Sequence, residues 1–124
     1  MRILYILTLL MVSNYVNSQS LKCSDFQTGK FKLKVTNFNL PSITVIRTEK
    51  IQKETADGSK DMEGSIVWKS DCNYDLTYLN ATPEMNGKTV RVEILKIEGQ
   101  KAICKSTFED MPGIVLEFEM EKTN

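Results

Sequence analysis

The sequence predicts an all-β protein, an up-and-down antiparallel meander of seven to eight short strands that closes, or nearly closes, into a small barrel or half-barrel. Apolar and polar residues alternate through most of the chain after residue 28, which is typical of strands with one buried face. Turn sequences recur at intervals of about ten residues, as in antiparallel sheets. No segment combines helical spacing of apolar residues with capping residues, so the crossover helices that parallel strands need are missing.

The first part of the chain alternates clearly. We expect strands over residues 30–35, 42–49 and 64–70, turns at 39–42 and 56–59, and either a further strand or a continuation of the second over 50–55. Phe31 and Val35 share one face of the first strand, which ends before Pro41 because proline cannot donate a hydrogen bond to a sheet. The second strand is rich in β-branched residues. Ile66 and Trp68 share one face of the segment that follows the second turn.

The second part of the chain contains four more expected strands. They cover residues 74–78, 89–98, 101–108 and 114–121, and each of the three connections between them contains glycine. In the longest strand Val92 and Ile94 lie on one face, whereas Leu95 and Ile97 lie on the other. A bulge or bend near Leu95 is therefore needed to bury both pairs.

The last expected strand completes the sheet. It should bury four apolar side chains and turn its glutamates toward solvent, and the four are Ile114, Leu116, Phe118 and Met120. A meander of this kind curls so that its edges pair, because open edges promote aggregation. The predicted architecture is a small lipocalin-like barrel or half-barrel, formed by a single domain over residues 19–124.

Residues 1–18 have the layout of a secretory signal peptide. A short positive start precedes an apolar segment over residues 3–12, and Val16 and Ser18 occupy the −3 and −1 positions before Gln19. The apolar segment is shorter than the ~20 residues of a membrane-spanning helix. The alternative is a buried N-terminal helix or strand. We expect an exported protein, periplasmic or extracellular, with no integral membrane segment after signal removal.

Charge and residue types exclude several classes of function. The chain has 16 Lys plus Arg and 16 Asp plus Glu, so it lacks the basic excess that attracts nucleic acids or anionic membranes. It contains no histidine, which excludes imidazole metal sites and Ser–His or Cys–His nucleophile pairs. The common nucleotide-binding and hydrolase motifs are also missing. We expect a non-catalytic protein that binds no cofactor, metal or nucleic acid.

Three cysteines permit one disulfide and one free thiol in an exported protein. Loop-closure entropy does not choose among the three possible pairs, because their expected contributions are too similar. Cys104 lies in the middle of an expected strand, where a free thiol packs as a small apolar group. Cys23 and Cys72 lie near a chain end and in a turn, where the backbone can adjust to disulfide geometry. Position therefore favours a structural Cys23–Cys72 bond.

Aromatic residues on neighbouring strands form the candidate ligand site. Trp68, Tyr74 and Tyr78 would line an apolar cavity, and the alternative is ordinary core packing. Arg47 lies among β-branched residues, and an inward side chain would make it an anion anchor in the barrel mouth. We therefore expect these four residues to bind a small apolar or amphipathic ligand. The alternative function is an envelope module that contacts another protein, and a packed interior would favour that alternative.

Three segments together resemble a family of small exported proteins from Bacteroidetes-type bacteria that is lipocalin-like in pattern. The segments are CSDFQTGKF at 23–31, IRTEKIQKE at 46–54 and VWKSDCNYDLTY at 67–78, and the resemblance extends over most of residues 23–120. Members are sometimes labelled DNA topoisomerase IV. That activity needs a much longer chain, a DNA-binding domain with a nucleophilic tyrosine, and an acidic metal site. The resemblance implies that Cys23 and Cys72 are paired, and it adds no catalytic residue.

Overall fold

Within residues 20–123, which the computed structural model describes, the chain forms eight strands and one short 3₁₀ turn. The turn is η1 (Cys23–Phe26), and the strands are β1 (Gly29–Val35), β2 (Ile43–Arg47), β3 (Ile51–Thr55), β4 (Met62–Ser70), β5 (Asn73–Asn80), β6 (Thr89–Glu98), β7 (Lys101–Phe108) and β8 (Met111–Thr123). No helix in this part of the chain is long and apolar enough to cross a membrane. The predicted signal peptide at 1–18 lies outside the described residues.

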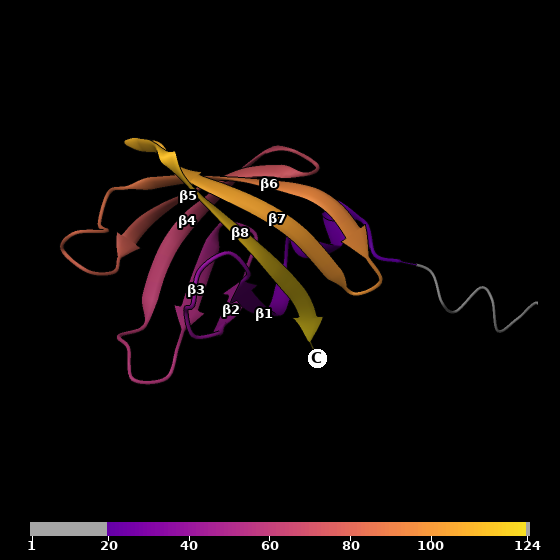
Figure 1. The fold of residues 1–124 in the computed structure, drawn as a ribbon, viewed down its shortest axis with the longest axis horizontal. Helices are drawn as coiled ribbons and strands as arrows, with labels where there is room; N and C mark the ends of the chain where they lie inside the picture. Colours follow the sequence, from indigo (N-terminus) through magenta and orange to yellow (C-terminus); the bar gives the residue numbers. More distant parts are fainter. Residues whose placement is uncertain (1–19, 124) are drawn as a thin grey trace, which may run out of the picture.

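Each strand pairs antiparallel with the next along the chain, and β8 returns to pair with β1, which closes the barrel (Figure 1). The predicted all-β meander is therefore confirmed, with full closure. The polar segment 50–55 contributes a strand of its own, because β2 ends at Arg47 and the chain reverses over residues 48–50. Closure leaves none of the eight described strands with a free edge.

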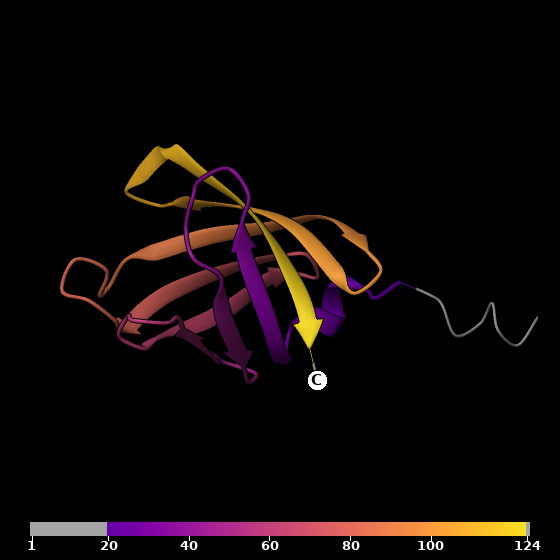
Figure 2. The same ribbon diagram turned by 60° about the horizontal axis from the view of Figure 1, so that its bottom comes forward.

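The two ends of the barrel are built differently. The connections β1–β2, β3–β4, β5–β6 and β7–β8 lie at one end, which we call the loop end. The turns β2–β3, β4–β5 and β6–β7 lie with η1 at the other end, which we call the closed end. In Figure 2 the indigo η1 turn lies at the opposite side of the barrel from the tip of the β7–β8 hairpin. Up-and-down order requires this division, because alternate connections fall at the same end.

The segment before β1 seals the closed end. Phe26 in η1 is fully buried and stacks on Phe31, with ring centroids 5.4 Å apart. The backbone amide of Leu21 donates to the carbonyl of Gly99 at 3.0 Å, which ties the segment to the β6–β7 turn. The chain therefore covers its own barrel opening with an aromatic side chain.

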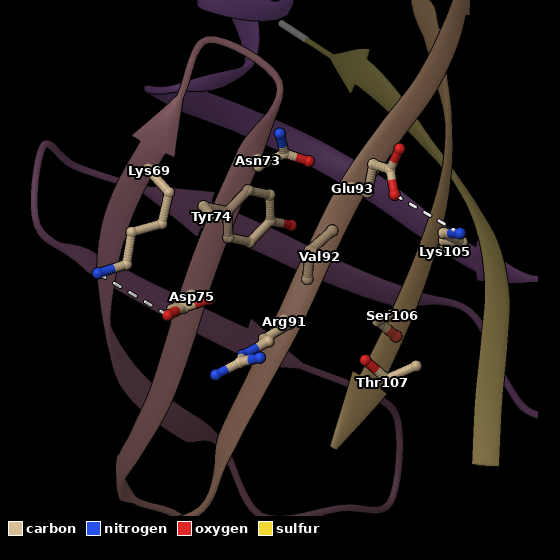
Figure 3. A pocket seen from close by; sticks show the side chains of 10 residues that line it. All are labelled: Lys69, Asn73, Tyr74, Asp75, Arg91, Val92, Glu93, Lys105, Ser106 and Thr107. Atoms are coloured by element: carbon tan, nitrogen blue, oxygen red, sulfur yellow. Dashed lines mark ion pairs between the residues drawn. The ribbon is translucent and has the colours of Figure 1, made fainter. Parts of the chain in front are cut away.

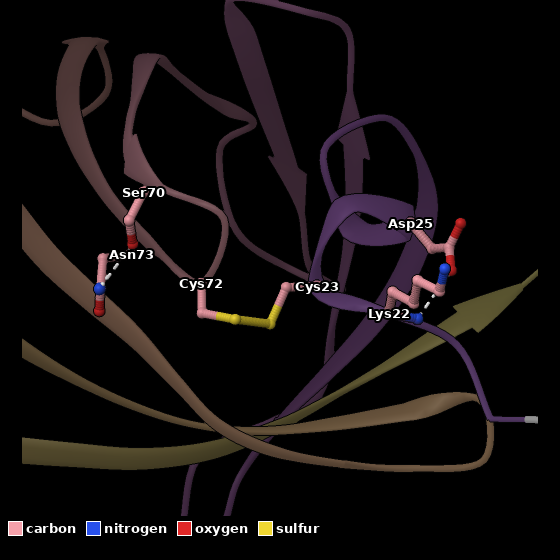
Figure 4. The surroundings of a disulfide bond; sticks show 6 residues. All are labelled: Lys22, Cys23, Asp25, Ser70, Cys72 and Asn73. Carbon is pink, nitrogen blue, oxygen red and sulfur yellow. Dashed lines mark hydrogen bonds between the residues drawn. A yellow bond between two sulfur atoms is a disulfide. The ribbon is translucent and has the colours of Figure 1, made fainter.

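A disulfide fixes this seal to the sheet. Cys23 in η1 is bonded to Cys72 in the β4–β5 turn, with Cα atoms 5.2 Å apart (Figure 4). Beside it, the side-chain amide of Asn73 donates to the Ser70 hydroxyl at 2.8 Å and closes the tight turn. The predicted Cys23–Cys72 pairing is confirmed, and Cys104 is a buried free thiol on β7.

A bulge in β6 corrects one predicted face. The β6–β7 register shifts between Ile94 and Lys96, so Leu95 is the extra residue. The shift moves Ile97 to the inner face, where it packs against the core. Leu95 itself is 51% exposed. The bulge was predicted correctly, but the expectation that Leu95 is buried is wrong, because a bulged residue has no place in the alternation.

The start of β8 also differs from the expectation. The strand begins at Met111, paired with Phe108, where the sequence indicated a turn over 110–113. The register of β7 and β8 shifts beside this pair, and Ile114 is 46% exposed instead of buried. The remaining three predicted inward residues are buried or half-buried, namely Leu116, Phe118 and Met120.

Candidate functional site

A cavity of about 380 Å³ occupies the part of the barrel interior next to the loop end, which we call the loop half. Its walls are mostly aliphatic and aromatic, and they include Leu33, Ile43, Leu76, Val90, Phe108 and Phe118. Residues of three loops also line it, namely Leu40, Lys60 and Met85, so the cavity reaches the loop end. Its volume lies within the range of about 300–1,000 Å³ that is typical of small-molecule sites.

Polar groups of β3 and β5 interrupt this apolar wall. Gln52 and Glu54 on β3, with Tyr74 and Tyr78 on β5, line the cavity. The Tyr78 hydroxyl lies 2.9 Å from each carboxylate oxygen of Glu54 and donates its proton to that group. Glu54 is only 7% exposed. The wall therefore carries a buried carboxylate that faces an apolar space.

Gly64 on β4 allows side chains of β3 and β5, which are not neighbouring strands, to contact each other. In the register, Gly64 on β4 lies opposite Gln52 on one side and opposite Tyr78 on the other. Because Gly64 has no side chain, Tyr78 can extend across β4 to Glu54. A Cβ atom at this position would lie 2.8 Å from the carbonyl oxygen of Thr77, which is too close for an alanine without movement of the backbone.

Burial controls the protonation of this cluster. Desolvation raises the pKa of Glu54 above the ordinary carboxyl value, and three favourable interactions oppose it: hydrogen bonds from Tyr78 and Gln52, and the charge of Arg47. Desolvation also raises the pKa of Tyr78, and the negative charge of Glu54 raises it further. Tyr78 therefore remains a hydrogen-bond donor over the whole neutral range.

Arg47 points into the barrel, but at the closed end and not at the mouth. Its Nε donates to Gln52 Oε1 at 2.8 Å, its Nη1 donates to the Phe26 carbonyl at 2.8 Å, and its Nη2 donates to the Tyr74 hydroxyl. The guanidinium carbon also lies 4.4 Å from the centroid of the Tyr74 ring. Arg47 is 3% exposed and does not line the cavity. The predicted position of Arg47 in the barrel mouth is therefore wrong. Its guanidinium donates to acceptors of the protein itself.

Trp68 belongs to the closed end as well. Its ring packs against Tyr74, with centroids 4.7 Å apart, and lies 5.8 Å from the Arg47 guanidinium carbon. Its indole Nε1 is buried without a hydrogen-bond partner in the described residues. The four predicted ligand-binding residues thus divide: Tyr74 and Tyr78 line the cavity, whereas Trp68 and Arg47 do not.

Gln52 and Glu54 are the site residues that the sequence did not reveal. Their strand is polar on both faces, and its one large apolar residue, Ile51, lies on the face opposite to them. Alternation alone therefore could not identify the inner face of β3. In the structure Gln52 pairs with the inward-facing Arg47 on β2, and this register places Gln52 and Glu54 on the inner face of β3.

A second hollow, of about 430 Å³, lies over the outer faces of β4 to β7 (Figure 3). Its charged side chains are largely paired: Lys69 with Asp75 at 4.0 Å, and Lys105 with Glu93 at 3.5 Å. Exposed pairs of this kind are ordinary surface features and contribute little. No group of three or more Cys, Asp or Glu side chains among residues 20–123 is placed to hold a metal ion.

No protein-family model matches the chain, and comparisons with curated proteins and with solved structures found no match. A functional interpretation therefore rests on the geometry of the chain's own residues.

Proposed function

We propose that this protein is an exported, non-catalytic barrel that binds a small apolar or amphipathic molecule in the cavity of its loop half. The observation that carries the proposal is the cavity itself, about 380 Å³ of space with apolar walls and a cluster of polar groups on one side. This volume would hold about a dozen water molecules at liquid density, so a small organic molecule would fit. An apolar wall with few polar groups is the usual composition of such sites.

The different structures of the two barrel ends indicate where a ligand would enter and leave the cavity. The closed end is blocked by η1, the disulfide and the Arg47 cluster, whereas the loop end contributes Leu40, Lys60 and Met85 to the cavity lining. A ligand would therefore enter between the loops. The three loops of six or more residues are at this end, and loops move more readily than the strands that they join.

Export is part of the proposal and has separate support. A disulfide between Cys23 and Cys72 is stable in oxidising compartments and rare in reducing ones. The expected signal peptide agrees with this placement. Mass measurement of the protein isolated from its native cells would test it: loss of residues 1–18 supports export, and an intact N-terminus contradicts it.

The test of ligand binding uses N-phenyl-1-naphthylamine, a neutral apolar dye whose fluorescence rises in apolar surroundings. We expect saturable binding to the wild-type protein. Val90→Phe should lower the affinity about tenfold or more, because the larger side chain fills the cavity. Val67→Phe makes the same chemical change on the exposed outer face of β4 and should leave binding unchanged. No dye binding, or equal binding by both variants, would overturn the proposal.

A second candidate function, contact with another envelope protein, has one observation in its favour. Exposed apolar side chains gather at the loop end, namely Phe38, Leu40, Met111, Ile114 and Val115. The β1–β2 loop and β8 are held together there, since the Asn37 side chain donates to the Val115 carbonyl at 2.9 Å. Replacement of Phe38 and Ile114 by serine should abolish such a contact without affecting dye binding, and crosslinking in cells would measure the loss.

A further inference from the structure

We propose that the ligand's polar end is an ammonium or amine group that binds to the carboxylate of Glu54. This inference rests on the proposed function and specifies the chemical class of the ligand. It follows from three features of the interior: an unpaired buried acid, a wall rich in hydrogen-bond acceptors, and a cation that is already used elsewhere.

The first feature is a buried carboxylate without a direct counter-ion. Within residues 20–123, the ion pairs closer than about 4 Å all lie on the outer surface, and none includes Glu54. Glu54 is nevertheless 7% exposed and faces a space with apolar walls. A buried carboxylate is costly unless it is paired, so a cation delivered into the cavity would gain a partner that the protein itself does not supply.

The second feature is the number of acceptor positions. A carboxylate offers about four lone-pair positions, and among the described residues the donors to it are the Tyr78 hydroxyl, whose single proton is shared between the two oxygens, and the Gln52 amide. Once Tyr78 has donated that proton, its own oxygen can only accept. An ammonium group carries three N–H donors and no acceptor, which matches this wall better than a carbonyl or a carboxylate does.

The third feature is the position of the interior cation. Arg47 donates to Gln52, to the Phe26 carbonyl and to Tyr74, and it does not line the cavity. An anionic ligand would therefore meet Glu54 and not Arg47, and would be repelled. Lys60 lines the mouth, but its Nζ donates to the Ala81 carbonyl at 3.1 Å. Above the raised pKa of Glu54, the charge that a ligand meets in the depth of the cavity is therefore negative.

The test compares three small probes with a common phenyl body: 2-phenylethylamine, 2-phenylethanol and phenylacetate. Each would displace N-phenyl-1-naphthylamine from the wild-type protein. We expect the amine to bind about tenfold or more tightly than the alcohol, because both can donate to the carboxylate but only the ammonium brings an opposite charge to it, and the acid to bind most weakly. Equal binding of amine and alcohol, or preference for the acid, would overturn the inference.

Two variants test whether Glu54 causes the preference for the amine over the alcohol. In Glu54→Gln the advantage of the amine over the alcohol should fall to about twofold or less, while binding of N-phenyl-1-naphthylamine persists and shows that the variant is folded. Glu117→Gln makes the same change at an exposed glutamate on β8 and should keep the wild-type order. An unchanged amine preference in Glu54→Gln would contradict the inference.

A pH titration of the wild-type protein provides a measurement that needs no variant. Amine affinity should fall as the pH is lowered through the raised pKa of Glu54, while alcohol affinity should change much less because the alcohol carries no charge. The other groups facing Glu54 are Tyr78, Gln52, Arg47 and Tyr74, and burial raises the pKa of Tyr74 to about 12 and that of Tyr78 as well. A pH-independent amine affinity contradicts the inference. Dye binding without amine preference would leave the proposed function standing, whereas absence of all binding would overturn both.

Discussion

The closed end and the loop half of the barrel each bury an ionisable side chain, but only the one in the loop half borders open space. At the closed end each of the three guanidinium nitrogens of Arg47 donates to a protein acceptor, and aromatic rings of Phe31, Trp68 and Tyr74 surround the guanidinium. In the loop half Glu54 accepts from Tyr78 and Gln52, has no ion-pair partner within the described residues, and borders a cavity. Burial alone therefore does not identify a binding site, whereas unused hydrogen-bonding capacity beside an open space does.

The largest expected effect tests whether Arg47 is structural. Arg47→Met would leave the Phe26 carbonyl, Gln52 and Tyr74 without their donor and would remove the positive charge that lowers the pKa of Glu54. We expect a loss of about 3–5 kcal/mol in the free energy of unfolding, measured by urea titration. Arg91→Met, at a side chain that is 63% exposed, should stay within about 0.5 kcal/mol of wild type. A mild effect of Arg47→Met would show that the closed end is not a satisfied network.

The same truncation at the two ends should give different losses. Phe31 is fully buried against Phe26, so Phe31→Ala should cost about 3–5 kcal/mol. Phe108 is half-buried and already borders the cavity, so Phe108→Ala should cost only about 1 kcal/mol. Urea titrations of both variants measure the two losses in the free energy of unfolding. Equal losses would show that the closed end is not more tightly packed than the loop half.

The disulfide supports the closed end from outside the core. Replacing Cys23 and Cys72 by serine should lower the free energy of unfolding by about 2–4 kcal/mol, because the bond closes a long loop in the unfolded chain. Reduction of the wild-type protein serves as the control and should give the same loss. Dye binding in the loop half should persist under native conditions. A variant that folds but no longer binds the dye would show that the two ends are coupled.

The smallest expected effect concerns the stability contribution of Glu54. Its pKa is higher in the folded protein than in the unfolded chain, so the folded state holds the proton more tightly. Stability from this group is present below the ordinary carboxyl pKa of 4.5 and is lost as the pH rises through the raised value. Without ligand, the stability of Glu54→Gln relative to wild type should therefore increase from acidic to neutral pH. If the free energies of unfolding of the two proteins changed with pH in the same way, the proposal that burial raises the pKa of Glu54 would be contradicted.

The sequence predicted much of the framework because its causes are local. Alternation of side chains and turn residues predicted seven of the eight strands and left residues 50–55 open as a strand or a continuation, and chain position favoured the Cys23–Cys72 pair. The predictions were wrong where a register shift intervened. Leu95 and Ile114 are exposed because the pairing of β7 with its neighbours slips beside each of them, and a slip depends on two strands at once.

The candidate site was predicted only in part, for a related reason. Of the four predicted ligand-binding residues, Tyr74 and Tyr78 line the cavity, whereas Arg47 and Trp68 lie at the closed end. Glu54 was missed because β3 is polar on both faces and its inner face follows from pairing with β2. Its contact with Tyr78 depends further on Gly64 in the strand between them.

By itself, therefore, the sequence determined the all-β class and the order of the strands and favoured the Cys23–Cys72 disulfide, because periodicity, turn chemistry and chain position are properties of short segments. Only the tertiary structure decided which polar side chains face inward, which end of the barrel is sealed and where space remains. Those outcomes depend on the registers of several strands together and on the summed volumes of the side chains that they bring into one interior.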